Sequence, residues 1–387
     1  MTDLGVLTFH NNENRGAILQ AYGVCRLLSE VFDANAEVVE YRTKSKENSR
    51  KRSLVANKKP WTIPDQIRDR RIVEKFFKTQ LPTSENSTVT DNHRAAVDWL
   101  RERNYDGLVT GSDEIWKINE KKRTGIQGLV SPTRPFPNLY FLDDALSGVK
   151  FSYAASANKT DLDTLSTDTV ETFRRHLNAY DYISVRDRHT KELIKKLDVG
   201  NVTQVPDPTL MIEIPTQSVR SVLREHGVDL DEPILNFHGP VNPIFERICN
   251  KYRERGYQIV TTRTSPYADI EMRGVVDPFE YYSLYEHFDM VVTNSLHSSI
   301  FSIRHGTPFA TIDTSPIYKH IESKTYSLLH DFDMLYRHID AVDGDVSEFF
   351  EKRDALETKP DETNIQNRID ELQKRGYEFL DRVSESL

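Results

Sequence analysis

The sequence predicts an α/β protein built from two successive Rossmann-like domains that face a cleft. Short apolar runs such as GVLTF (5–9) and AEVVEY (36–41) flank an amphipathic stretch, and strand, helix, strand at this spacing is typical of a parallel sheet. The alternation resumes in the second half of a chain of 387 residues, which is long for one hydrophobic core. Ligands of such folds bind beyond the carboxyl ends of the strands, so we expect functional residues there.

The first domain is expected to cover residues 1–207. Its predicted strands are 5–9, 36–41, 106–112, 150–156, 181–187 and 202–207. Residues 44–95 break the pattern, because they are polar and basic, with one helical stretch (QIRDRRIVEKFFKTQL) and a loop-like SENSTVTDN. We interpret them as an insertion whose charge serves either as a solvated surface or as a contact for an anionic partner.

The second domain is expected at 208–345, after a break in the pattern between 206 and 232. Its predicted strands are 233–239, 257–263, 289–295 and 308–313. Residues 346–387 are expected to form a helical tail, since Ile365, Ile369 and Leu372 recur at helical spacing. This closing helix could cross back to the first domain.

Composition excludes several classes of protein. The formal net charge of −9 argues against a general nucleic-acid binder, which usually carries a basic face. Two distant cysteines, Cys25 and Cys249, give neither a disulfide framework nor a metal spacing, and we expect no metal site. With no signal peptide and no long apolar run, the sequence predicts a cytoplasmic protein, and leaves open both its oligomeric state and a peripheral contact with the inner face of the cell membrane.

The stretch VVTNSLHSSIFSIRHGTPFATID (291–313) places His297 where a strand meets a helix. Asn294 or Ser295 can cap the start of that helix. Its N–H groups and the positive end of its dipole suit a phosphate or carboxylate, to which the His297 ring could donate a proton. The alternative is a histidine that only caps or packs.

Two junctions in the first domain suit a sugar. HNNENRG (10–16) offers amides that match hydroxyl groups and a glycine that permits close approach, and GSDEIW (111–116) offers a carboxylate and an indole for stacking on a pyranose. The alternatives are an Asx-rich turn, and helix capping with the indole in the core. The candidate sugar-binding residues are Asn11, Asn14, Gly16, Ser112, Asp113 and Trp116.

Three cations are candidates for binding an anion. Arg186 ends the strand of YISVRD, and its planar guanidinium suits a bidentate grip on carboxylate or phosphate, unless it pairs with a neighbouring acid. Lys319 and Lys324, in SPIYKHIESK, could clamp a phosphate or belong to a solvated basic helix. The sequence contains no P-loop, GxGxxG, HExxH or GxSxG motif.

Taken together, six stretches resemble the polysaccharide pyruvyl transferase family. In the family's order they are TFHNNENRGAILQAYG, GSDEIW, SYAAS, YISVRD, VPDPTLMI and NSLHSSIFSIRHGTPF, spanning roughly residues 5–330. Two positions depart from the family pattern: Ser298 stands where glycine usually follows the histidine, and Arg15 where an aromatic residue is common. Whether they alter or abolish activity is left open.

The resemblance implies a fold of the glycosyltransferase type B kind and transfer of the enolpyruvyl unit of phosphoenolpyruvate to two hydroxyls of a sugar. The product would be a pyruvate ketal, with phosphate released and no cofactor required. The acceptor would be a surface polysaccharide or a lipid-linked or nucleotide-linked precursor. In this reading His297 is the acid or phosphate stabiliser, Arg186 binds phosphoenolpyruvate, and Lys319 and Lys324 assist.

Two other functions remain open at this point. One is a nucleotide-sugar-dependent glycosyltransferase of the same fold, since fold alone does not determine function. The other is a non-catalytic glycan-binding relative. Saccharide-dependent release of phosphate from phosphoenolpyruvate would distinguish a pyruvyl transferase from both of these alternatives.

Overall fold

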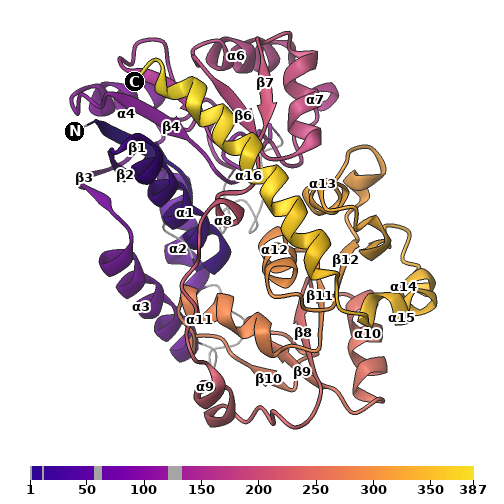
Figure 1. Ribbon diagram of the computed structural model, residues 1–387. Helices are drawn as coiled ribbons and strands as arrows, with labels where there is room; N and C mark the ends of the chain where they lie inside the picture. Colours follow the sequence, from indigo (N-terminus) through magenta and orange to yellow (C-terminus); the bar gives the residue numbers. More distant parts are fainter. Residues whose placement is uncertain (1, 11–12, 56–62, 121–132) are drawn as a thin grey trace. The chain divides into compact units, whose positions relative to one another are not determined.

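The computed structural model describes residues 2–10, 13–55, 63–120 and 133–387, which divide into two compact units (Figure 1). Unit 1 contains Met1–Ile63, Phe77–Ile212 and Leu372–Leu387, and unit 2 contains Pro64–Phe76 and Glu213–Glu371. The expected domains were continuous in sequence, whereas these units are not. Residues 64–76 belong to unit 2, where Phe76 packs edge-on against Phe279 at 4.8 Å.

The expected tail is also divided. Its last helix, α16 (Glu362–Ser384), contributes residues to both units, and its final turns bury Phe379, Leu380 and Val383 in unit 1. Gln373 donates a hydrogen bond to the carbonyl of Leu210 there, at 2.8 Å. The end of the tail therefore belongs to the first unit, as a closing helix that crosses back to it would.

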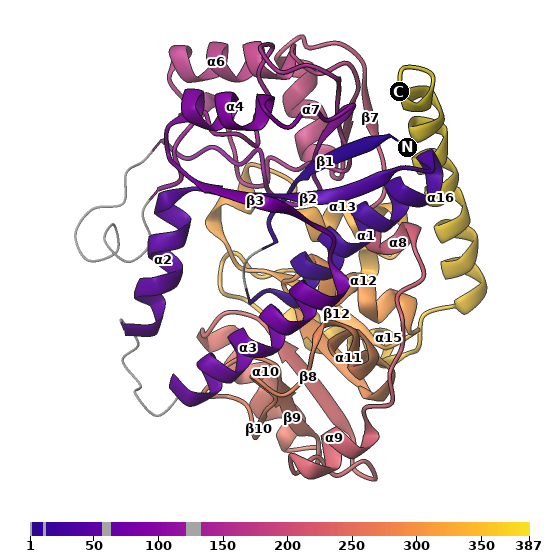
Figure 2. The same cartoon turned by 90° about the vertical axis from the view of Figure 1, so that its left-hand side faces the viewer.

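Unit 1 is built on a five-stranded parallel sheet, with strand order β3-β2-β1-β4-β5 (Figures 1 and 2). The strands are β1 (Asp3–Leu7), β2 (Asn35–Arg42), β3 (Thr83–Val89), β4 (Gly107–Thr110) and β5 (Val149–Ser152). A parallel pair, β6 (Ile183–Val185) and β7 (Val202–Gln204), continues beyond β5 through the bridge between Ala155 and Val185. The helices of this part are α1 (Arg15–Phe32), α2 (Lys44–Val55), α4 (His93–Arg101), α6 (Thr167–Leu177), α7 (Arg188–Lys196) and α8 (Pro208–Met211). Helix α3 (Ile63–Gln80) is divided, with its residues 64–76 in unit 2.

The polar 44–95 segment is more ordered than its composition indicates. SENSTVTDN was expected to be a loop, but β3 occupies most of it and pairs with β2. The prediction failed because β3 is an edge strand. An edge strand can keep several polar side chains in solvent while its backbone completes the sheet.

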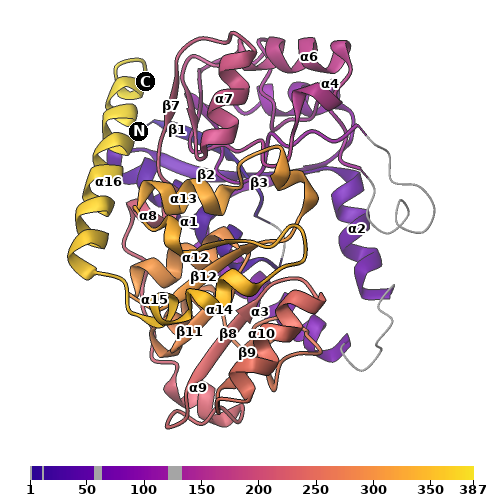
Figure 3. The same ribbon diagram turned by 90° about the vertical axis from the view of Figure 1, so that its right-hand side faces the viewer.

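Unit 2 contains a six-stranded parallel sheet, with strand order β10-β9-β8-β11-β12-β13 (Figure 3). The strands are β8 (Ile234–His238), β9 (Gln258–Thr261), β10 (Ile270–Glu271), β11 (Met290–Thr293), β12 (Phe309–Asp313) and β13 (His338–Asp340). The sequence analysis missed β10 and β13, which are two and three residues long and lie at the edges. Helices α9 (Arg220–Glu225), α10 (Pro243–Arg253), α11 (Pro278–Ser283), α12 (Leu296–Arg304), α13 (Lys324–Asp331), α14 (Ser347–Glu351) and α15 (Arg353–Glu357) complete the unit.

Both strand orders reverse direction at one point. In unit 1 the chain moves outward from β1 to β2 and β3, then returns to add β4 on the other side of β1. In unit 2 the same reversal separates β8 from β11. Loops at such a switch point diverge and leave room for a ligand beyond the carboxyl ends of the strands. Among the described helices, none is both long enough and apolar enough to cross a membrane.

Candidate functional site

The switch point of unit 2 is held by hydrogen bonds between the ends of β8 and β11. The backbone N–H of Asn294 and the hydroxyl of Thr293 both donate to the carbonyl of His238, at 3.2 and 2.9 Å. The same Thr293 hydroxyl accepts from the N–H of Ser295, at 2.9 Å. These bonds fix the turn from which α12 starts.

His297 lies in the first turn of α12 and is 6% exposed, as its position in the sequence predicts. Ser295 occupies the N-cap position, but its side chain makes no capping hydrogen bond, which differs from the expected role of Asn294 or Ser295. Its carbonyl accepts from Ser299 instead. The start of α12 is therefore set by the backbone turn at Thr293, and Asn294 has an exposed side chain.

A chain of hydroxyl groups links α12 to His238. The Ser298 hydroxyl is 2.6 Å from that of Tyr285, which is 2.9 Å from that of Tyr281, which is 3.4 Å from Nδ1 of His238. All four side chains are buried. Ser298 therefore has a defined place in this unit, although the related family usually carries glycine there.

His238 is a buried group with one unsatisfied ring nitrogen: its Nε2 has no hydrogen-bond partner among the described residues. Burial lowers the pKa of His238 well below its usual value, and the positive charge of Arg263 and the ring of His297 lower it further. The imidazole is therefore neutral at pH 7, with one nitrogen available to an incoming group.

Arg263 follows the end of β9 and supplies the positive charge. The Arg263 side chain is exposed, yet the protein that surrounds it still lowers its pKa; the Tyr281 and Tyr285 hydroxyls raise it, and Arg273 lowers it. Within the described part of the chain its guanidinium makes no hydrogen bond or ion pair. Positive or proton-bearing groups thus lie at the carboxyl ends of neighbouring strands: Arg263, His238, His297 and the start of α12. This arrangement suits an anion.

The sequence analysis missed His238 and Arg263. Both lie in stretches interpreted only as strands, PILNFHG and YQIVTTR. A signal was present: both are polar residues at the carboxyl end of a strand that neighbours the switch point. Applying the strand-end rule to every strand would have selected them.

The two predicted lysine candidates lie after β12. Lys319 ends a short 3₁₀ turn and pairs with Asp343, and both side chains are well exposed. Lys324 begins α13 and is half-buried.

In unit 1, the predicted Arg186 is the centre of a buried charged network. Its side chain is 4% exposed; one terminal nitrogen is 3.0 Å from Asp207 and the other is 3.8 Å from Asp113. Burial opposes its charge, but Asp207 and Asp113 raise its pKa overall. Gln20 donates to the same Asp207 oxygen at 2.6 Å and to the Ser112 hydroxyl at 2.5 Å. Arg186 therefore ties the end of β6 to the switch-point loop that follows β4.

Asp113 is half-buried in that loop and adopts a φ of 84°, in the left-handed region that a side chain other than glycine seldom occupies. Such backbone conformations cluster at functional sites. On the other side of the switch point, Asn14 caps α1 by accepting from the N–H of Ala17, and Gly16 is buried in the first turn. Asn11 lies outside the described residues.

Two sugar-binding predictions are wrong. Trp116 is fully buried; its indole N–H donates to the carbonyl of Tyr140 and its ring packs edge-on against Tyr180. Its size and apolar ring place it in the core, so no face is left for a pyranose. Ser112 is also fully buried, with its hydroxyl bonded to Gln20 and to the carbonyl of Ala154, so it supports the loop from within.

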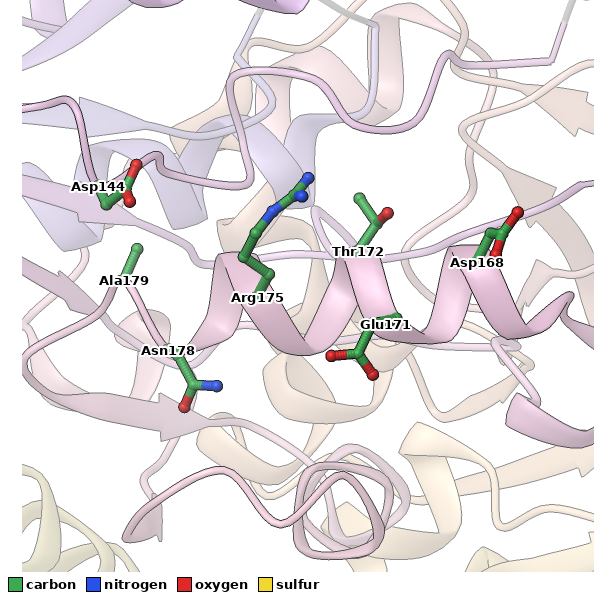
Figure 4. Close-up of a pocket in the computed structure, with 7 residues that line it drawn as sticks. All are labelled: Asp144, Asp168, Glu171, Thr172, Arg175, Asn178 and Ala179. Atoms are coloured by element: carbon green, nitrogen blue, oxygen red, sulfur yellow. The ribbon is translucent and has the colours of Figure 1, made fainter.

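A separate surface concavity of about 630 Å³ lies along the exposed side of α6 (Figure 4). Its lining includes three carboxylates, from Asp144, Asp168 and Glu171, and the guanidinium of Arg175. It contains none of the predicted site residues, and its mixed charges select no single class of ligand.

Two parallel-sheet units, each with polar and charged groups at its switch point, define a protein of the glycosyltransferase type B-like class, which confirms the predicted fold class. The UDP-GlcNAc 2-epimerase of Methanocaldococcus jannaschii shares this fold, with a TM-score of 0.51 and 9% identity, over 97% of this chain and 100% of that one. The UDP complex of S. aureus MnaA matches with a TM-score of 0.49 and 10% identity, over 98% and 91% of the two chains. The Streptomyces sp. SF2575 glycosyltransferase SsfS6, complexed with thymidine diphosphate, matches with a TM-score of 0.47 and 10% identity, over 100% of both chains.

The chain belongs to the polysaccharide pyruvyl transferase family, whose family model matches residues 14–316. No curated protein sequence matches it. The family confirms the resemblance seen in the six motifs, and it indicates a transferase.

Proposed function

We propose that this protein transfers the enolpyruvyl unit of phosphoenolpyruvate to two hydroxyls of a sugar in a surface polysaccharide or its precursor, forming a pyruvate ketal and releasing phosphate. The observation that carries the proposal is the cluster at the switch point of unit 2. There a buried neutral His238, with one nitrogen available, neighbours His297, Arg263 and the N-terminus of α12. Phosphoenolpyruvate is a small, highly charged anion that requires such groups.

In the proposed reaction, His297 donates a proton to the methylene carbon of phosphoenolpyruvate, which becomes a methyl group. The adjacent carbon gains oxocarbenium character, and a sugar hydroxyl attacks it, forming a C–O bond and losing its proton. The C–O bond to phosphate then breaks, and the second hydroxyl adds to the same carbon and loses its proton. The first step consumes one proton and the two additions release two: one restores the acid, and the other is taken up by the phosphate, which leaves with the electron pair of its C–O bond as hydrogen phosphate.

Arg263 and the N–H groups of α12 would bind the phosphate and stabilise the charge that develops as it departs. Neutral His238 would accept or donate one hydrogen bond without adding charge. A positioned acid contributes about 10²–10⁴-fold in rate. His297 is therefore the residue on which turnover should depend most.

Unit 1 supplies the groups proposed to bind the sugar. Asp113 is half-buried beside Arg186, and Asn14 presents an exposed amide at the start of α1. Carboxylate and amide oxygens suit sugar hydroxyls. Arg186 would orient Asp113, and its Nε and second terminal nitrogen, which lack hydrogen-bond partners among the described residues, could bind an anionic group.

The test is incubation with phosphoenolpyruvate and a panel of glycan precursors, with phosphate release and product mass measured together. The proposal expects saccharide-dependent phosphate release and a product heavier by one pyruvate ketal. Binding and turnover of a nucleotide sugar would favour a glycosyltransferase instead, and glycan binding without turnover a non-catalytic relative.

A further inference from the structure

A second cluster of chemically active side chains lies in unit 1, outside the groups described above. His93 begins α4, Asp143 lies in the loop before β5, and His176 lies in the last turn of α6. One ring nitrogen from each histidine and one carboxylate oxygen lie within 4.8 Å of one another. The rings of His93 and His176 meet edge-on, with centroids 5.0 Å apart, although they come from different helices.

We propose that His93, Asp143 and His176 form a binding site for a divalent transition metal, with Zn²⁺ as the best match. Two imidazoles and one carboxylate are ligands that Zn²⁺ accepts, and three protein ligands leave a fourth position for water. The predicted role is to tie α4, the Asp143 loop and α6 together.

The distance between His93 and Asp143 fits coordination better than a hydrogen bond. Nε2 of His93 is 3.3 Å from Oδ2 of Asp143, which is long for a charge-assisted hydrogen bond. In a tetrahedral site with ligands about 2.0–2.1 Å from Zn²⁺, the ligand atoms lie about 3.3 Å from one another. The other nitrogen of His93, Nδ1, is buried and has no hydrogen-bond partner among the described residues.

The other two groups are oriented as metal ligands usually are. Nδ1 of His176 is 2.9 Å from the carbonyl of Leu142; as the donor, it leaves Nε2 with the lone pair that a metal needs. Oδ1 of Asp143 accepts from the N–H of Ala145 at 3.0 Å, which leaves Oδ2 for the cluster. The side chain of His176 is buried, whereas those of His93 and Asp143 keep 17% and 26% of their surface exposed, which gives an ion access.

The local charge permits a cation. Asp144 is the next residue in the chain and adds a second carboxylate, while Arg175 adds one positive charge. Two carboxylates and one guanidinium leave a net negative charge beside the imidazoles. Neither Asp144 nor Arg175 is needed as a ligand.

The experiment titrates Zn²⁺ into chelator-treated full-length protein by calorimetry, and measures the melting temperature with and without Zn²⁺. We expect one Zn²⁺ per chain and a higher melting temperature when it binds, because a ligand that binds the folded state stabilises it. Asp143→Asn, His93→Ala and His176→Gln should each lower the association constant by more than about 10-fold. The controls are Asp98→Asn, on the exposed side of α4, and His226→Ala, an exposed histidine of unit 2; both should bind as the wild type does.

The proposal is overturned if the wild type binds no stoichiometric Zn²⁺, or if all three site variants bind it as tightly as the controls. Asp143→Asn keeps the size of the side chain, and its metal-free melting temperature shows whether the variant folds. Loss of binding by this folded variant, with binding kept by Asp98→Asn, supports the site.

Discussion

His238 illustrates how burial and charge prepare a side chain for a ligand. Desolvation, Arg263 and His297 together keep its pKa low, so the ring stays neutral and one nitrogen remains without a partner among the described residues. A buried polar atom left unsatisfied costs about 1–3 kcal/mol. A site that binds phosphoenolpyruvate gives a reason for this cost, because the substrate would supply the missing partner.

We therefore expect His238→Asn to raise the KM for phosphoenolpyruvate by about 10-fold or more, which corresponds to the loss of one hydrogen bond to a charged group. The melting temperature should stay equal or rise, since the unsatisfied ring is removed. Steady-state kinetics and thermal unfolding of one preparation test this. His330→Asn, at an exposed position of α13, is the matched control. An unchanged KM combined with a large loss of stability would make His238 a packing residue.

Arg186 is a different case, because its partners are already present. Lysine keeps the charge but cannot span Asp207 and Asp113 with a planar fork. Breaking a buried ion pair typically costs about 3–5 kcal/mol. Since Arg186→Lys retains one charge contact, we expect a loss of about 2 kcal/mol in the free energy of unfolding, measured by urea denaturation. A variant as stable as the wild type would show that the network contributes little.

At the scale of the elements, the loop that follows β4 requires a glycine at position 111. Gly111 has a φ of 125°, and a Cβ at this position would lie 2.1 Å from the carbonyl oxygen of Tyr153. The neighbour is backbone next to β5, so it cannot rotate away. The loop carrying Asp113 is therefore built on this glycine.

We expect Gly111→Ala to lower the free energy of unfolding by about 3 kcal/mol or more, from strain and steric overlap combined. Gly227→Ala is the control: its φ is 85° with no atom within 4 Å of a Cβ, so only the strain of about 1–2 kcal/mol applies. Urea denaturation of both variants separates the two effects. Equal losses would show that the contact with Tyr153 relaxes.

The sequence predicted the helices and strands better than it predicted which of them pack against one another. Periodicity and strand ends located α1, the strands around both switch points and the position of His297, because these depend on neighbours in sequence. It could not predict that residues 64–76 pack with Phe279, or decide between a core position and a sugar-binding position for Trp116, because these depend on contacts across the fold. His238 and Arg263 were not predicted, although the sequence carries a signal for both. Each is a polar residue at the carboxyl end of a strand.

Across the whole molecule, burial keeps several histidines neutral, and this makes the stability of the fold depend on pH. Burial lowers the pKa of His305 to about 4, and those of His238, His93, His176 and His287 are also lowered. In the unfolded chain these rings bind a proton near pH 6.5. The unfolded state then holds more protons, so stability is complete above about pH 6.5 and falls as the pH decreases toward 4.

The melting temperature should therefore drop by several °C between pH 7 and pH 5, before most carboxylates titrate. His305→Gln should reduce this drop, whereas His226→Gln, at an exposed position, should not. A melting temperature independent of pH over this range would contradict the assigned burial of these rings.

The proposed chemistry depends most directly on His297. The decisive measurement is saccharide-dependent phosphate release from phosphoenolpyruvate by wild type and His297→Asn, with the melting temperature of each preparation recorded. The account predicts that the variant folds with nearly the wild-type melting temperature and loses about 10²-fold or more in turnover. A folded His297→Asn protein with near-normal turnover would contradict it.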